Sequence, residues 1–278
     1  ASLARTIGPT LRFLLETEAH VYAFSIAANV LLSFFPFLLT MVILCRHLFH
    51  WEPGVRAILF VVSRCFPDYH NGSYIDIGGL LVTAARDHKH ISVLSLLLLF
   101  FTANGIFEPL EVALNRAWRV KLNRSYLKNQ MVSLGLVFLC GVLMLAAIVL
   151  IAWNSDALSH TLGQKVSLQT GRSILFKLVS IPVFVLIIFA IYWILPNRKI
   201  PASRLIPAAI FVGISLSAVN YVNLLTWPWL FAKLKNEGGP FVHSASILLW
   251  SFFSSLSVLA GAEWSARVTL SDELLEDK

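Results

Sequence analysis

Six long apolar stretches divide this chain, and shorter connections richer in polar residues separate them. The stretches cover residues 21–49, 91–115, 131–153, 178–195, 205–226 and 241–262. Each approaches the ~20 apolar residues that an α-helix needs to cross the core of a bilayer. The pattern therefore predicts an all-α, polytopic membrane protein with six transmembrane helices.

Composition supports the membrane assignment. The 278 residues are 57% hydrophobic and 13% charged, whereas about a quarter of the residues in a soluble domain are charged. Seven of the eight tryptophans fall at or near the ends of the predicted spans, as expected for an aromatic belt at the membrane interfaces. Trp250 is the exception, because it lies in the middle of the last span.

The connection over residues 50–90 is the longest and contains two apolar stretches, 55–66 and 75–85. Both are too short to cross a bilayer. We expect them to form short interfacial or re-entrant helices on the outer side of the membrane.

Lysine and arginine set the predicted orientation. The connections 116–130 and 196–204 hold five and three such residues and no acidic residue. By the positive-inside rule, both connections and both termini are expected in the cytoplasm. The chain then divides into a cytoplasmic or interfacial segment (1–20), one six-helix membrane domain (21–266) and an acidic cytoplasmic tail (267–278).

The second span carries an unusual polar face near its end, made of Asn104, Glu108, Glu111 and Asn115. The spacings of four, three and four residues place all four side chains on one side of a helix. Carboxylates are costly inside a membrane and usually face the interior of a helix bundle or a wet cavity. This face is the strongest sequence indication of a working site, which would bind a proton or a cation.

Two other spans offer polar partners for this face. The first span has a polar stripe ending in Asn29 and Ser33, and the last span has a face of small residues that leads to Glu263. Small residues permit close contact between membrane helices. We therefore expect spans one, two and six to meet around a set of candidate substrate- or ion-binding residues: Asn29, Ser33, Asn104, Glu108, Glu111, Asn115 and Glu263.

A structural interpretation of the same residues stays open. Glu108 or Glu111 could pair with Arg116, Arg119 or Arg198 and fix the packing of the helices, and Glu263 on its own suits a structural role. Asn220 and Asn223 in the fifth span either extend a polar path outward or form hydrogen bonds between helices.

Three motifs indicate a family: residues 33–36 (SFFP), 113–118 (ALNRAW) and 261–263 (GAE). With the order of the six spans, they resemble the YihY/BrkB family of bacterial inner-membrane proteins from about residue 19 to residue 266. The resemblance implies a multi-pass protein of the bacterial inner membrane. The family once carried a ribonuclease BN label, regarded as a misassignment, and some members are linked to the export of envelope lipids or glycolipids. It supplies no established catalytic residues.

The motifs of enzymes are missing from the sequence. It contains no Gly-rich phosphate loop, metal-hydrolase signature or Ser/His/Asp constellation, so we expect neither an enzyme nor a bound cofactor. The pairs His47/His50 and His88/His90 lack the third or fourth ligand of a typical zinc site. Retention of positive charge in the cytoplasm explains the basic loop after the second span, so no nucleic-acid partner is expected.

The leading functional interpretation is a transporter or a protein that handles lipids or other amphiphiles, with a polar cavity between spans one, two and six. Basic residues at its rim would attract an anionic headgroup, and they are Arg116, Arg119, Lys121 and Arg198. Membrane lipids are the expected partners, and the small-residue faces suit a homo-oligomer. The alternative is a scaffold for envelope assembly that transports nothing.

Overall fold

The computed structural model describes residues 2–65, 79, 81, 83, 93–120, 124–161, 168–238 and 241–276. The regular structure in these ranges is helical, which confirms the predicted all-α class for this part of the chain. The helices are α1 (Ser2–Glu16), α2 (Ala19–Ile43), the π-helical turn η1 (Leu44–Leu48), α3 (Glu52–Cys65), α5 (Val93–Ala117), α6 (Tyr126–Thr161), α7 (Leu168–Ile194), α8 (Ala202–Gly238) and α9 (Phe241–Glu276).

Within the described residues, four segments are long and apolar enough to cross a membrane: Ala19–Arg46, Tyr126–Ala147, Ala202–Lys233 and Val242–Thr269. They match the first, third, fifth and sixth predicted spans. The second and fourth predicted spans correspond to α5 and α7, and α7 contains a shorter apolar helix over Ile181–Ile194. A count of six spans stays a prediction.

Four helices, α6, α7, α8 and α9, are longer than the apolar stretches that predicted them. The last helix is the clearest case, because α9 continues to Glu276 through most of the segment expected as an acidic tail. In the outer connection, α3 forms over the first of the two predicted short helices. Most of the second, residues 75–85, lies outside the described residues.

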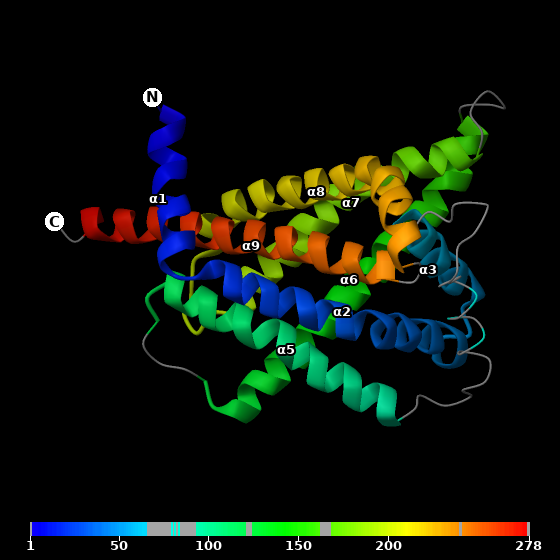
Figure 1. Ribbon diagram of the computed structural model, residues 1–278, viewed down its shortest axis with the longest axis horizontal. Coiled ribbons are helices and arrows are strands. Elements are labelled where there is room, and N and C mark those ends of the chain that lie inside the picture. The colour runs from blue at the N-terminus through cyan, green and yellow to red at the C-terminus, as the bar shows by residue number, and fades with distance from the viewer. Residues whose placement is uncertain are drawn as a thin grey trace.

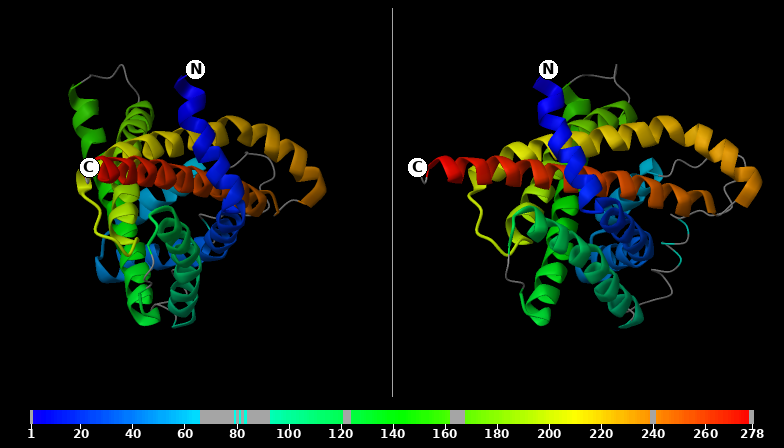
Figure 2. Two further views of the ribbon diagram at one scale, coloured as in Figure 1. Left: turned by 90° about the vertical axis from the view of Figure 1, so that its left-hand side faces the viewer. Right: turned by 60° about the vertical axis from the view of Figure 1, so that its left-hand side comes forward.

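The six long helices pack as a closed ring (Figures 1 and 2). Around the ring, α2 contacts α5, α5 contacts α6, and α6 contacts α7; α7 then contacts α8, α8 contacts α9, and α9 returns to α2. A further contact joins α5 and α9 inside the ring, so the expected meeting of spans one, two and six is confirmed. The helix α1 lies outside the ring and runs steeply across α9 near the ends of α2 and α9 (Figure 1).

Two tryptophans expected at the membrane interface belong to the protein core instead. Trp118 is 0% exposed and joins the larger hydrophobic cluster, and Trp227 is 2% exposed and joins a second cluster near the ends of α2, α3 and α8. Trp193 and Trp229 are exposed, as an interfacial belt requires. A position at the end of a span therefore does not by itself distinguish a belt residue from a core residue.

A glycine in α9 sets the distance between three helices. A Cβ atom at Gly261 would meet the Val212 side chain of α8 and the hydroxyl of Tyr192 on α7. The same Tyr192 hydroxyl donates a hydrogen bond to the carbonyl of Val258 in α9, at 2.5 Å. The small residue predicted on the last span is thus required by close helix packing.

We expect Gly261→Ala to lower the free energy of unfolding by roughly 1–3 kcal/mol, because the added methyl group overfills this contact. Unfolding in mild detergent, followed by circular dichroism, would measure the change. The matched control is Gly135→Ala in α6, where a new Cβ would have no atom within 4 Å. Equal losses in the two variants would contradict the packing argument.

Candidate functional site

The polar face of α5 separates into a buried part and an exposed part. Glu111 and Asn115 are each only 5% exposed, whereas the Glu108 side chain lies on the exposed surface of the protein. The backbone of Asn104 is helical, but its side chain lies outside the described residues. Of the three described side chains of this face, the two nearest its end are covered, because the start of α6 and the α7–α8 connection pack there.

Amide side chains surround the Glu111 carboxylate. Asn115 donates from Nδ2 to Oε1 at 3.4 Å, and the side chains of Asn129 on α6 and Asn197 in the α7–α8 connection also form hydrogen bonds with this carboxylate. The guanidinium of Arg124 supplies an opposite charge. A buried carboxylate needs such partners, since an unpaired charge in a low-dielectric region is costly.

Arg124 also binds the carboxyl end of α7. Its guanidinium donates to the carbonyl oxygens of Ile194, Leu195 and Pro196 at 2.9, 3.3 and 3.2 Å. The last carbonyls of a helix have no partner within the helix and carry partial negative charge. The planar guanidinium of arginine has five N–H donors and can reach several of them at once.

Two further bonds fasten the α7–α8 connection to the end of α5. The backbone N–H of Asn197 donates to Asn115 Oδ1 at 2.9 Å, and Arg198 donates to the carbonyl of Trp118 at 3.5 Å. We call the group formed by Glu111, Asn115, Arg124, Asn129 and Asn197 the polar clamp. It joins three segments that are far apart in the sequence.

The polar clamp supports the structural interpretation of Glu111, with a different partner from those expected. The arginine that acts electrostatically on the carboxylate is Arg124, which was not among the three expected partners, Arg116, Arg119 and Arg198. Arg116 is exposed and lies over the ring of Tyr22, 6.0 Å from its centre, and Arg119 is exposed in a left-handed backbone conformation. Lys121 lies outside the described residues.

Glu263 takes part in a separate contact. Its Oε1 pairs with Arg267 one turn along α9 at 3.2 Å, and Arg267 donates to the hydroxyl of Thr10 in α1 at 3.0 Å. Arg267 therefore attaches α1 to the bundle, and Glu263 pairs with this arginine and not with a residue of the polar clamp.

The polar residues of the first span bond within their own helix. Asn29 donates to the carbonyl of Ser25 at 2.9 Å, and Ser33 donates to that of Val30 at 3.2 Å. The Asn29 side chain also fills the space in front of Gly105, where α2 and α5 approach each other closely. The structure thus distributes the described side chains of the predicted residues over four places: the polar clamp, the exposed surface of α5, the α1–α9 contact and α2.

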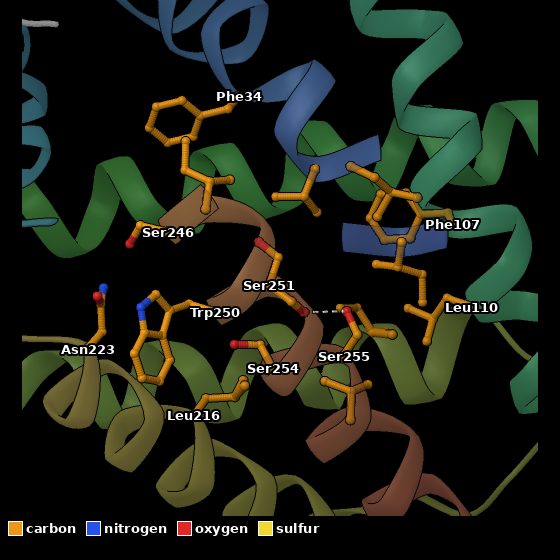
Figure 3. Close-up of a pocket in the computed structure, with 16 residues that line it drawn as sticks. Phe34, Phe107, Leu110, Leu216, Asn223, Ser246, Trp250, Ser251, Ser254 and Ser255 are labelled. Atoms are coloured by element: carbon orange, nitrogen blue, oxygen red, sulfur yellow. Dashed lines mark hydrogen bonds between the residues drawn. The ribbon is translucent and has the colours of Figure 1, made fainter. Parts of the chain in front are cut away.

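A cavity of about 430 Å³ lies inside the ring, between α2, α5, α7, α8 and α9 (Figure 3). The helices of spans one, two and six form part of its wall, as expected, together with α7 and α8. None of the six predicted site residues whose side chains the structure describes lines it, and no described lining residue is charged. The lining consists of Ile26, Val30, Phe34, Ile106, Phe107, Leu110, Ile191, Leu216, Asn223, Ser246, Ile247, Trp250, Ser251, Ser254, Ser255 and Val258.

Serines make one wall of this cavity small and weakly polar. The Ser255 hydroxyl donates to the carbonyl of Ser251 at 2.7 Å (Figure 3), so it is already satisfied by its own helix. Phe107 and Leu110 of α5 form the opposite, apolar wall (Figure 3). Two lining residues were already unusual in the sequence. Trp250 lies in the middle of a predicted span, and Asn223 is an amide within a predicted span.

We expect Glu111→Ala to destabilise the protein by about 2–4 kcal/mol, because it leaves three amides without their buried acceptor and removes the opposite charge near Arg124. A double-mutant cycle with Arg124→Ala should show coupling, measured by thermal or chemical unfolding in detergent. The control is Glu16→Ala, which removes the exposed Arg12–Glu16 pair of 2.6 Å and should change stability little. Additive effects of the Glu111 and Arg124 substitutions would contradict the polar clamp.

Comparison with known proteins gives the chain a family. The profile described as Virulence factor BrkB matches residues 10–277. Similar proteins include two UPF0761 membrane proteins. The one from Acinetobacter baylyi is 26% identical over 89% of this chain and 58% of its own length. The one from a Psychrobacter species is 22% identical over 94% of this chain and 48% of its own length.

A third relative, YfkH of Bacillus subtilis, is named as ribonuclease-like and is 26% identical over 87% of this chain and 89% of its own length. The chain spans about half the length of the two UPF0761 proteins. No solved structure matches it. Since the family profile covers nearly the whole sequence and the ring contains helices of membrane-spanning length, the chain belongs to the BrkB family of integral membrane proteins.

Proposed function

We propose that the protein handles a lipid or a similar amphiphile by taking its hydrocarbon chain into the cavity between α2, α5, α7, α8 and α9. The single observation that carries this proposal is the cavity itself, which is large, predominantly apolar and free of charged lining residues. Binding there would be driven by the removal of apolar surface and by close packing against the aliphatic and aromatic side chains.

The size of the cavity supports one chain as the occupant. A volume of about 430 Å³ falls within the roughly 300–1,000 Å³ of typical ligand sites. A water molecule in the liquid occupies ~30 Å³, so the cavity has room for about fourteen groups of the size of a water molecule, such as the methylene groups of a chain. One acyl chain fits this space better than a complete two-chain lipid.

The position of the cavity supports a ligand that arrives from the membrane. Its residues on α2, α8 and α9 lie within Ala19–Arg46, Ala202–Lys233 and Val242–Thr269, the segments long enough to cross a bilayer. A hydrocarbon chain would therefore enter at the depth where lipid tails lie. The acidic residues expected to bind a proton or a cation do not line this space, so ion coupling has less support.

A scaffold without transport activity is the second candidate, and the polar clamp favours it. The most connected polar residues of the described structure, Glu111 and Arg124, hold α5, α6 and α7 together. If packing is their whole contribution and the cavity takes no ligand, the protein would act through its surface. The two candidates differ in whether the cavity binds a hydrocarbon chain.

We expect a phospholipid with a diazirine in its acyl chain to label the cavity segments of α5 and α9 after reconstitution of the full chain in nanodiscs. Ser254→Phe should reduce this labelling roughly tenfold, since losing about two buried CH₂ groups at ~0.8 kcal/mol each has that effect. Mass spectrometry of the labelled peptides provides the measurement.

The matched control is Ser257→Phe, which adds the same ring to α9 at a position outside the cavity lining. Labelling should then stay near the level of the unsubstituted protein, as it should in Glu108→Gln, whose side chain is exposed. Absence of labelling in the cavity segments of the unsubstituted protein would reject the lipid proposal and favour the scaffold.

A further inference from the structure

Two polar atoms at the cavity have no hydrogen-bond partner in the protein. One is the indole nitrogen Nε1 of Trp250 on α9, and the other is the amide oxygen Oδ1 of Asn223 on the neighbouring helix α8. Both atoms are buried among neighbouring protein atoms at the edge of the cavity. In Figure 3 they lie on the same side of the cavity, away from Phe107 and Leu110.

Such atoms are uncommon, because most buried polar groups are paired and an unpaired group costs about 1–3 kcal/mol. The other hydroxyl groups described in the spans mostly bond to their own helices, as Ser255 does to Ser251 and Ser217 does to Gly213. Trp250 and Asn223 differ in keeping an unused donor and an unused acceptor beside a space large enough for a ligand.

These two unpaired atoms limit which functional group of a ligand could bind to both of them. An indole N–H can only donate a hydrogen bond, and the amide oxygen of asparagine can only accept one. A hydroxyl group is the smallest group that satisfies both, since its oxygen accepts from Trp250 while its O–H donates to Asn223. An ester, an ether or a carboxylate offers no proton to Asn223, and an ammonium group offers no lone pair to Trp250.

The uncharged lining of the cavity also disfavours the binding of a charged group next to Trp250 and Asn223. No described lining residue carries a charge, so a phosphate or an ammonium group would enter the apolar interior without a counter-charge from these residues, at a large cost in solvation. The basic residues expected to attract an anionic headgroup, Arg116, Arg119 and Arg198, are outside the lining.

We propose that the cavity selects an uncharged lipid with a hydroxyl group and binds that hydroxyl between Trp250 Nε1 and Asn223 Oδ1. The hydrocarbon chain extends from there past Ser254 toward Phe107 and Leu110. This assignment rests on the proposed function and narrows its substrate class from amphiphiles in general to neutral lipid alcohols.

Competition for the photolabelled site tests the assignment. Three competitors with the same saturated chain, a long-chain alcohol, its methyl ether and its phosphate monoester, are added to nanodiscs that contain the full chain and a diazirine-bearing alcohol. We expect the alcohol to compete about fivefold better than the ether, because only the alcohol donates to Asn223. The phosphate monoester should compete least.

Two substitutions separate the roles of the two side chains. Asn223→Leu, which keeps a similar volume, should abolish the advantage of the alcohol over the ether. Trp250→Phe should weaken both competitors to a similar extent, since both accept a hydrogen bond from the indole. Persistent labelling of the cavity peptides in each variant would show that the fold and the binding of the chain survive.

The competition experiment separates failure of the hydroxyl assignment from failure of the proposal that the cavity binds a hydrocarbon chain. Labelling of the cavity with equal competition by alcohol and ether, or with preference for the phosphate, would overturn the hydroxyl assignment and leave the binding of a hydrocarbon chain intact. Water would then be the simpler partner for Trp250 and Asn223. No labelling in the unsubstituted protein would instead remove the proposed function on which the assignment rests.

Discussion

The close approach of α2 to its two neighbours holds the ring of helices together. Ala19, Ala23 and Ala27 recur every four residues on one side of α2 and are almost completely buried. Farther along the helix, the Asn29 side chain occupies the space in front of Gly105 on α5. Helices in a bilayer gain little from hydrophobic burial, because lipid tails are as apolar as their side chains, so small residues and tight packing provide the attraction. Since α2 contacts both α5 and α9, the cavity would lose one wall without this contact.

The positions of the helices along the chain could be predicted from the sequence. Which side of each helix packs against its neighbours could not. Long apolar runs have few alternatives to helices in a membrane, because every backbone polar group must be satisfied within the segment. The orientation of Glu108 and Glu111 depends on what packs over each of them, and that is decided by the start of α6 and by the α7–α8 connection. Arg124 is 70 residues or more away in sequence from the carbonyls that it binds, so no local pattern could have indicated its role.

In this fold, the buried charged residues lie away from the cavity between the spans. The buried acids and their arginine partners lie at the polar clamp and at the α1–α9 contact, and the cavity between the spans holds none of them. A buried charge contributes to specific packing when its partners are fixed, but it would make an apolar cavity costly to fill. The sequence analysis associated the acidic residues with a working site because both are rare in membranes. The structure favours uncharged residues, Trp250 and Asn223, as the groups that recognise a ligand.

The attachment of α1 has a mechanical consequence for the bundle. Arg267 connects Glu263 of α9 to Thr10 of α1, and α1 crosses α9 steeply outside the ring (Figure 2). A rotation of α9 about its own axis would carry Arg267 away from Thr10 or drag α1 with it. Because α9 provides more of the described cavity wall than any other helix, a rotation of α9 that reshaped the cavity would also break the bond between Arg267 and Thr10 or displace the amino-terminal helix.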